Sequence, residues 1–344
     1  MNINQYFKEA VKNEASDLHL VGSELPMIRV EGQLKELGEK PLNPKELETS
    51  IYEEILNKNQ KDKFEEEKEL DISYEVEGTR FRVNLHWQEG VIGLSARLIP
   101  NTIPSPADLH FEPTLAGISN MLDGLVLVTG PTGCGKSTTI ASIIEEINKN
   151  RKAHIVTIED PIEFLFQDKQ SLIEQREIGV DTKSFDSALK HVLRQDPNVI
   201  LVGEMRDPET IATVLTAAET GHLVLSTLHT NSAAEAVERI VDVFDGSKQK
   251  QILVQLSAVL KVVVAQQLLS AKDGGRVPAR EILVNTPGVA NLIKENSINQ
   301  IKSAIQTGSK EGMISMENSI KQLVKEGWIT DEVAEKRSGR NRMV

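Results

Sequence analysis

The sequence predicts an α/β protein in which a small α+β domain precedes a parallel sheet covered by helices. Four short, nearly continuous apolar runs read as strands buried on both faces. These runs are 125–129, 155–158, 199–202 and 223–226. Helical patterns at 138–148, 185–194, 208–220 and 232–244 follow them, and such alternation forms a parallel sheet. The residues before this region combine helices with short strands that end in a meander.

Composition and charge limit the class of protein. Of the 344 residues, 39% are hydrophobic and 26% charged, as in globular proteins with room for two domains. The formal net charge of -12 disfavours nucleic acid and anionic lipid as partners. The single cysteine, Cys134, excludes an intrachain disulfide and a cysteine-based zinc site. With no signal peptide and no run of 18 apolar residues, we expect a cytoplasmic protein that meets a membrane only through partners.

The first 99 residues form the predicted α+β domain. Helices are expected at 2–14 and 43–57, the second capped by Asn43 with Pro44 in its first turn. The charged stretch 58–69 suits a solvated helical face or a loop. Strands are expected at 18–21, 27–30, 70–77, 79–87 and 90–99.

A proline-rich segment at 100–113 is the predicted linker, because four prolines stiffen it without making it helical. The second domain then covers 114–344. Beyond residue 247 the pattern predicts mainly helices, with starts at Thr286 and Ser297 and a stop at Gly327.

A glycine-rich turn between the first apolar run and the following helix matches the P-loop pattern G-x-x-x-x-G-K-[ST] in full. Its glycines let backbone N–H groups point at phosphate, and the helix directs its positive end there. Lys136 is expected to reach the β- and γ-phosphates, and Ser137 to ligate Mg²⁺. The predicted ATP-binding residues are Gly130, Pro131, Thr132, Gly133, Cys134, Gly135, Lys136, Ser137 and Thr138.

Acidic residues follow two of the other predicted strands. Glu204 comes after the third run, at the carboxyl edge of the sheet, where a carboxylate suits Mg²⁺ directly or through water. The turn after the second run carries Glu159, Asp160 and Glu163, which are candidates for orienting and deprotonating the attacking water. A solvated acidic turn is the alternative for at least one of these three.

Two histidines bracket the fourth run, His222 before it and His229 after it. A neutral imidazole at a strand end can contact the γ-phosphate and sense its loss. A hydrogen-bonded structural histidine is an equal alternative for each. Zinc is disfavoured because no third ligand lies nearby in the sequence.

One strand of the first domain has a basic outer face. Alternation along 79–87 directs Phe81 inward and Arg82 outward, and Arg97 projects from the next strand. Such arginines can act on the ATP of a neighbouring subunit, or can be solvated and paired with surface glutamates. The residues alone slightly favour the solvated alternative.

Together these elements resemble the secretion-superfamily ATPases and, within them, the PilT-type retraction motors of type IV pili. The resemblance runs almost end to end. It rests on ASDLHL (15–20), PMIRVEG (26–32), RFRVN (80–84), GLVLVTGPTGCGKSTT (124–139), HIVTIEDPIEF (154–164), LRQDPNVILVGEMRDPETI (193–211), TAAETGHLVLSTLHTNSAAEAVERIVDVF (216–244) and SAIQTG (303–308).

The resemblance implies a PAS-like first domain, a RecA-like P-loop ATPase domain and a homohexameric ring that drives pilus retraction by removing pilins. The implied partners are an inner-membrane platform protein and the pilus base, at the cytoplasmic face of the inner membrane. The implied roles are phosphate and Mg²⁺ binding for Lys136 and Ser137, Walker B acid for Glu204, catalytic base for Glu163, histidine element for His222 and His229, and arginines acting in trans for Arg82 and Arg97.

Some positions depart from the family pattern. Gly90 stands where an arginine is common, and in GVANLIKE (288–295) Ala290 and Lys294 replace arginines of the retraction-associated helix. These departures do not affect the residues expected to hydrolyse ATP.

An accessory retraction ATPase, or a pilus assembly or type II secretion ATPase, is therefore the alternative function. A non-hydrolysing adaptor is disfavoured by Glu163 and Glu204, and a nucleic-acid translocase by the net charge.

Overall fold

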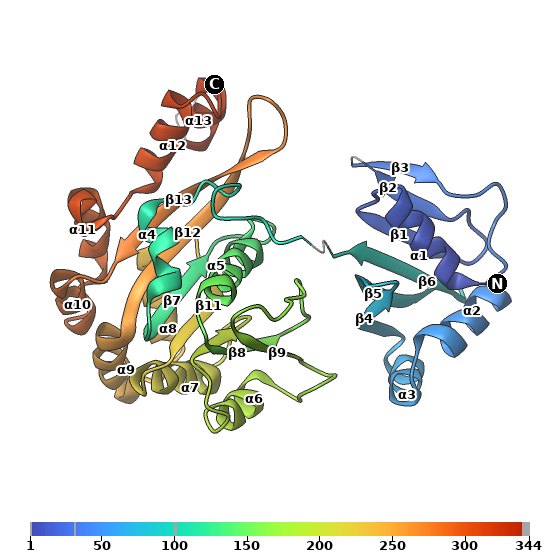
Figure 1. Ribbon diagram of the computed structural model, residues 1–344, viewed down its shortest axis with the longest axis horizontal. Helices are drawn as coiled ribbons and strands as arrows, with labels where there is room; N and C mark the ends of the chain where they lie inside the picture. Colours follow the sequence, from blue (N-terminus) through green and yellow to red (C-terminus); the bar gives the residue numbers. More distant parts are fainter. Residues whose placement is uncertain (1, 31, 100–101, 339–344) are drawn as a thin grey trace. The chain divides into compact units, whose positions relative to one another are not determined.

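The computed structural model describes residues 2–30, 32–99 and 102–338. They form two compact units, Met1–Thr102 together with Glu163–Leu165, and Ile103–Ile162 together with Phe166–Val344 (Figure 1). The change from one unit to the other falls inside the predicted linker. Residues 100–101 of that linker lie outside the described residues.

The first unit is an antiparallel sheet with the strand order β3-β2-β1-β6-β5-β4. Its elements are α1 Ile3–Lys12, β1 Asp17–Val21, β2 Met27–Val30, β3 Gln33–Glu36, α2 Pro44–Ser50, a π-helical turn Ile51–Ile55, α3 Lys58–Glu67, β4 Glu69–Val76, β5 Thr79–Gln88 and β6 Val91–Leu98. The predicted helices and strands are all present, and the stretch 58–69 is largely helical. Strand β3 is an addition, which no apolar alternation marked because all four of its residues are exposed.

Local chemistry explains how these elements begin and turn. The side chain of Asn43 accepts hydrogen bonds from the backbone N–H groups of Lys45 (3.0 Å) and Glu46 (3.3 Å), so it caps α2 as predicted. Both turns of the meander have positive φ at their two central residues, as tight hairpins need. One of them is Glu89-Gly90, with φ of 48° and 79°, which places Gly90 at a hairpin tip.

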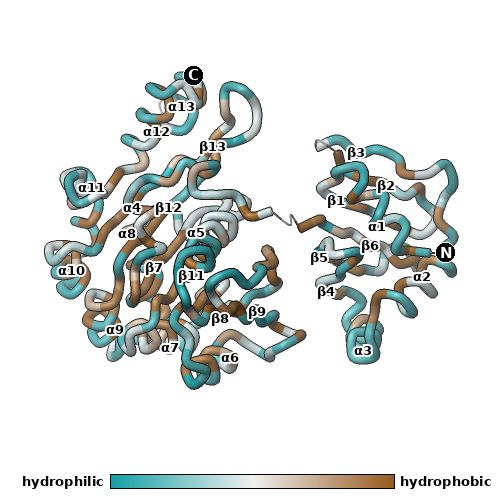
Figure 2. The backbone as a smooth tube through the Cα atoms, in the orientation of Figure 1, coloured by the Kyte–Doolittle hydropathy of each residue, from teal (hydrophilic) through white to brown (hydrophobic). Residues whose placement is uncertain are grey.

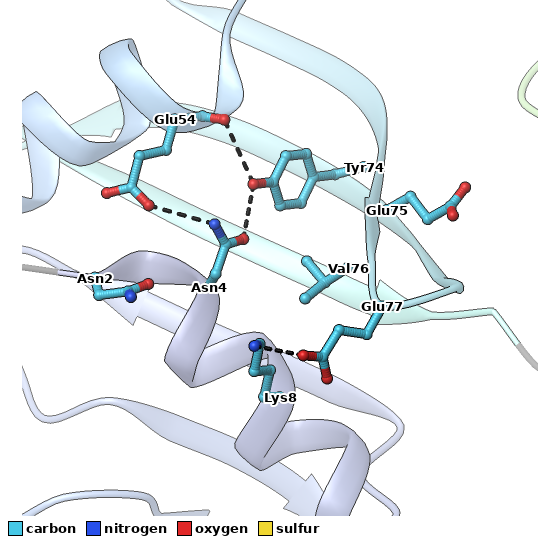
Figure 3. A pocket seen from close by; sticks show the side chains of 8 residues that line it. All are labelled: Asn2, Asn4, Lys8, Glu54, Tyr74, Glu75, Val76 and Glu77. Atoms are coloured by element: carbon cyan, nitrogen blue, oxygen red, sulfur yellow. Dashed lines mark hydrogen bonds and ion pairs between the residues drawn. The ribbon is translucent and has the colours of Figure 1, made fainter.

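The helices cover one face of this sheet. Phe7 of α1 packs edge-on against Phe81 of β5, with ring centroids 4.8 Å apart. A shallow pocket lies beside α1 and β4 (Figure 3). There Tyr74 Oη donates to Asn4 Oδ1 at 2.8 Å, and Asn4 Nδ2 donates to Glu54 Oε2 at 3.4 Å. These bonds between elements hold α1 against the sheet.

The second unit contains a mixed, mostly parallel sheet with the order β13-β12-β7-β11-β10-β8-β9, in which β13 alone is antiparallel to its neighbour. Its strands are β7 Gly124–Thr129, β8 His154–Glu159, β9 Leu172–Glu177, β10 Val199–Val202, β11 Leu223–Leu228, β12 Leu260–Ser270 and β13 Arg276–Val284. Its helices are α4 Pro113–Gly117, α5 Lys136–Asn150, α6 Phe185–Val192, α7 Pro208–Glu219, α8 Ala233–Asp242, α9 Gly246–Val259, α10 Pro287–Lys294, α11 Ile301–Thr307, α12 Met316–Lys325 and α13 Asp331–Ser338.

Two apolar cores lie on opposite faces of this sheet, and central strands between them, such as β7 and β10, are hydrophobic along most of their length (Figure 2). Helices α4 and α5 cover one face. Helices α6 to α11 pack on the other face. Strands buried on both faces need apolar residues at every position, which is why the four predicted runs did not alternate.

The expectation of a mainly helical region after residue 247 fails at 260–284, where two strands lie. The run 252–269 divides into the end of α9 and the long strand β12, which pairs with β13 as an antiparallel hairpin. A continuous apolar run suits a buried strand and a buried helix equally, so periodicity alone could not separate them. Strand β9 was also missed. Beyond β13 the prediction is correct, since Thr286 caps α10 by accepting from Val289 N at 3.3 Å.

No helix among the described residues is both long and apolar enough to cross a bilayer.

Candidate nucleotide-binding and catalytic site

Four neighbouring parallel strands end at one edge of the second sheet. They are β7, β11, β10 and β8, in that order. Parallel strands all present their carboxyl ends on the same side, so the segments that follow them meet there. The P-loop follows β7, His229 follows β11, Glu204 follows β10 and the acidic turn follows β8. The structure thereby brings four of the predicted functional segments to one edge.

The glycines of the P-loop have conformations that other residues rarely adopt. Gly130, Gly133 and Gly135 have φ of 144°, 76° and 87°. A Cβ on Gly130 would lie 2.2 Å from the carbonyl oxygen of Gln266 on β12. The loop is therefore curled closely against β12, with Gly135 in the left-handed conformation at the start of α5.

Lys136 is the first residue of α5 and is only 9% exposed. Its Nζ donates to Gly130 O at 2.9 Å and to Pro131 O at 3.3 Å, so the ammonium lies across the loop. Ser137 follows in the first turn of the same helix. A cation and a hydroxyl at a helix N-terminus favour anionic phosphate.

Cys134 is buried in the loop. Burial raises the pKa of its thiol above the ordinary value, and the neighbouring Lys136 charge opposes this only in part. The thiol is therefore protonated at neutral pH and acts as a small apolar group that packs inside the loop.

Glu204 lies between two nitrogen-bearing side chains. Its Oε2 accepts from Arg206 Nη2 at 2.7 Å and Nε at 2.8 Å, and its Oε1 lies 3.3 Å from His229 Nε2. The hydrogen bond and charge of Glu204 raise the pKa of Arg206, and the charge of Asp160 adds to this. Arg206 was not among the predicted site residues. The sequence feature that could have identified Arg206 is its position two residues after Glu204, which allows both side chains to face the same edge of the sheet.

Backbone contacts explain why Glu204 lies there. Gly203 N donates to Ile158 O of β8 at 2.8 Å, and Gly203 O accepts from Thr227 Oγ1 of β11 at 2.6 Å. A Cβ on Gly203 would lie 3.3 Å from Ile158 O, closer than most such contacts. The chain leaving β10 is thus held between its two neighbouring strands, which sets the direction of the next residue, Glu204.

The carboxylates of the acidic turn differ in burial. Glu159 is 8% exposed and accepts from Thr157 Oγ1 at 2.7 Å, whereas Asp160 and Glu163 are exposed. The buried carboxylate of Glu177 on β9 accepts from Ile162 N at 3.2 Å and fixes the turn between them. Glu159 is therefore engaged within the fold, and Asp160 and Glu163 are the two candidates that solvent reaches.

His222 does not belong to this edge. It precedes β11, whereas His229 follows it, so about 20 Å of strand separates the two histidines. His222 Nδ1 lies 2.9 Å from Ala217 O and 3.1 Å from Thr220 Oγ1, at the end of α7. Within this chain His222 thus has the contacts of a hydrogen-bonded structural histidine, the alternative given above, and a role for it at the nucleotide stays a prediction.

Arg82 and Arg97 lie on the outer face of the first unit, as predicted. They are paired positions on β5 and β6, and both are exposed. Arg97 Nε donates to Asp17 Oδ1 at 2.9 Å, and Arg29 Nε lies 3.8 Å from the other carboxylate oxygen. Burial raises the pKa of Asp17, but hydrogen bonds from Ser16 and Arg97 outweigh it and lower that pKa overall.

The oxygen groups at the edge suit a magnesium nucleotide. Ser137 offers a hydroxyl and Glu204 a carboxylate, and hard oxygen ligands are those that Mg²⁺ prefers. No three histidine, cysteine, aspartate or glutamate side chains in the described part of the chain gather as a metal site of their own. Two protein oxygens match Mg²⁺ that is bound mainly through phosphate and water, so the residues present fit this ion.

Comparison with known proteins shows the family of this chain. The family model for Type II/IV secretion system protein matches residues 1–337. The chain is 45% identical over 339 residues to the type IV pilus retraction ATPase PilT of Pseudomonas aeruginosa, covering 98% of both chains. It is 47% identical over 315 residues to the twitching motility protein of Neisseria gonorrhoeae, covering 91% of this chain and 84% of that one.

A solved structure agrees over the whole fold. The crystal structure of the pilus retraction motor PilT with bound ADP superposes with a TM-score of 0.92 at 42% identity, covering 100% of this chain and 99% of that one. The family model, the relatives and the solved structure all match nearly the whole chain. The chain belongs to the Type II/IV secretion system protein family and is an ATPase of its type IV pilus retraction branch.

Proposed function

We propose that this chain is the subunit of a homohexameric motor that couples ATP hydrolysis to the removal of pilins from the base of a type IV pilus. The full-length similarity to a retraction ATPase and to a twitching motility protein supports the pilus as the substrate. The observation that carries the ATPase part is the shared edge of β7, β11, β10 and β8, because it gathers a phosphate-binding loop and carboxylates after the ends of adjacent strands.

The P-loop and Lys136 bind the phosphates of ATP in this proposal. Backbone N–H groups of the loop and the N-terminus of α5 offer donors, and Lys136 moves from the loop carbonyls to the phosphate oxygens, which are stronger acceptors. Ser137 and Glu204 would hold Mg²⁺, which supplies positive charge to the phosphates when bound. Arg206 and His229 hold the Glu204 carboxylate in place.

Glu163 is the proposed base for the attacking water. It is exposed, and Glu177 holds the preceding turn through Ile162 N. A carboxylate in such a turn can orient a water and accept its proton as the bond to the γ-phosphate is formed. Asp160, whose charge acts on Arg206, is the second exposed acid and the alternative candidate.

Arg82 and Arg97 are proposed to act on the nucleotide of a neighbouring subunit. Their exposure and their adjacent positions on β5 and β6 support this, since two exposed guanidinium groups side by side suit a phosphate. Arg97 would have to exchange Asp17 for the phosphate, which is the more highly charged partner. The ring would work at the cytoplasmic face of the inner membrane, on a platform protein and the pilus base.

Two variants test the motor. Lys136→Ala and Glu204→Gln should each reduce steady-state phosphate release at least 100-fold, while Lys272→Ala, at an exposed lysine, should leave it unchanged. In a strain that carries only the Lys136→Ala protein, we expect surface pili without twitching. Normal movement of that strain would contradict the proposal.

Helix α10 favours one alternative, an accessory retraction ATPase. Ala290 lies on this helix, where the retraction branch commonly has arginine. A deletion strain separates the alternatives. Loss of the main retraction motor leaves excess surface pili and no movement, loss of an accessory motor weakens movement, and loss of an assembly motor leaves no pili.

A further inference from the structure

Two large polar side chains are buried where apolar ones would be expected, in the hairpin β12–β13. Gln266 is 4% exposed and Arg280 is 1% exposed. They are paired positions on the two strands, and Arg280 Nε donates to Gln266 Oε1 at 2.9 Å. The hydrolysis of ATP as described above uses neither of them.

Gln266 contacts the P-loop on its other side. Its Nε2 donates to Cys134 O at 2.6 Å, and its Oε1 accepts from Thr139 Oγ1 at 2.9 Å. The first contact is inside the loop, and the second is on the first turn of α5, after the loop. A single amide thus joins the phosphate-binding loop to the first turn of the helix that follows it. Its backbone carbonyl also lies where a Cβ on Gly130 would fall.

Arg280 contacts the segment 109–112 on its other side. Nη2 donates to Leu109 O at 2.8 Å, and Nη1 donates to His110 O at 3.1 Å and to Glu112 Oε2 at 3.2 Å. The guanidinium also lies over the ring of Phe111, 5.3 Å from its centroid. His110 is in the left-handed conformation, with φ of 49°. The segment is therefore held in its shape by a buried cation.

This arrangement is specific in a way that apolar packing is not. A buried charge is costly, and similar apolar side chains often replace buried ion pairs without loss of stability. The pKa of Arg280 is lowered by burial, which the charge of Glu112 only partly opposes. A guanidinium group has planar, directional donors, and these define where Leu109, His110 and Gln266 must lie.

We propose that Gln266 and Arg280 are positioning residues that tie the P-loop to the segment 109–112, so that nucleotide binding and the shape of that segment depend on each other. The segment is the end of the proline-rich stretch through which the chain enters the second unit. The inference rests on the proposed role of the P-loop in binding nucleotide. Coupling between two sites is reciprocal, so weakening one end must alter the other.

The first test compares two arginines of the same strand. Arg280→Lys keeps the charge but cannot reach all its acceptors, and we expect the dissociation constant of a fluorescent ADP to rise about tenfold. Arg276→Lys is the matched control at an exposed position and should change it less than twofold. The value of kcat at saturating ATP should fall by a smaller factor than the dissociation constant rises, because the acidic residues of the site are unchanged. An unchanged affinity in Arg280→Lys would overturn the proposal.

The second test follows the segment itself. The amides of Leu109, His110 and Phe111 donate to Ser105, Ala107 and Pro106 carbonyls, so their hydrogen exchange can be followed by mass spectrometry. In the unaltered protein, ADP should slow their exchange. In Glu112→Gln, which leaves every P-loop contact in place, saturating ADP should slow it clearly less. The same variant serves if Arg280→Lys does not fold.

The outcomes separate the two proposals. If the unaltered protein binds no nucleotide, the proposed P-loop site fails. If it binds ADP while exchange at 109–111 stays the same, the site stands and the tie to the segment is wrong. Equal slowing by ADP in the unaltered protein and in Glu112→Gln would also contradict the tie.

Discussion

His229 Nε2 lies 3.3 Å from Glu204 Oε1, although the two are 25 positions apart in the chain. The pair exists because β10 and β11 are adjacent and parallel and end together. Strand β11 also lies beside β7, which carries the P-loop. His229 therefore follows the strand that lies between β10, which precedes Glu204, and β7, which precedes the P-loop.

The two histidines should differ in their effect on catalysis. His229→Gln removes the ring nitrogen beside Glu204, and we expect kcat for ATP hydrolysis to fall about 10- to 100-fold. His222→Gln, at the opposite end of β11, should reduce kcat much less. Steady-state phosphate release by both variants, with thermal melting to confirm folding, provides the comparison. A larger loss in His222→Gln would contradict the assignment of the site to one edge.

The thiol of Cys134 should react slowly. Because burial raises its pKa, little thiolate is present at neutral pH, and the nucleophile in alkylation is the thiolate. We expect iodoacetamide to modify the folded protein far more slowly than the urea-unfolded protein between pH 7 and pH 8. Mass spectrometry at timed intervals measures both rates. A rate in the folded protein equal to that of the unfolded chain would show that the loop does not bury this group.

The cap of α2 should contribute to stability. Asn43→Ala removes an acceptor of two backbone hydrogen bonds and should lower the free energy of unfolding by about 1 kcal/mol. Asn2→Ala is the control, because Asn2 also precedes a helix but makes no side-chain cap bond. Urea unfolding followed by circular dichroism compares them. Equal effects of the two substitutions would mean that the cap bonds of Asn43 do not matter.

The ion pair of Asp17 should affect the acid limit of stability. Its pKa is lowered in the folded state, so its stabilising contribution is complete above the ordinary value of about 3.9 and is lost as the pH falls through the lowered value. Arg97→Gln removes a donor and should move acid unfolding to higher pH. Arg82→Gln changes the charge equally but leaves the Arg97 and Arg29 contacts to Asp17 in place, and should move it less. Circular dichroism between pH 2 and pH 6 measures the midpoints, and equal midpoints would argue against the pair.

Much of the local structure could be predicted, because it depends on neighbours in the sequence. The cap residues Asn43 and Thr286 were recognised because a helix start needs a side-chain acceptor within three residues. The outward direction of Arg82 followed from the two-residue period of a strand. Strand β12 was missed because its residues are buried on both faces, so its sequence shows no alternation of apolar and polar residues.

The P-loop and the acidic residues after the strands were determined by the sequence alone, since a motif and its flanking strand and helix are contiguous. Only the tertiary structure decided that four strand ends meet at one edge, and that Gln266 and Arg280 join the P-loop to segment 109–112. The physical reason is that strand order is set by long-range packing. Residues more than 100 positions apart become neighbours through burial of shared apolar faces, and no local pattern records which strands those faces will bring together.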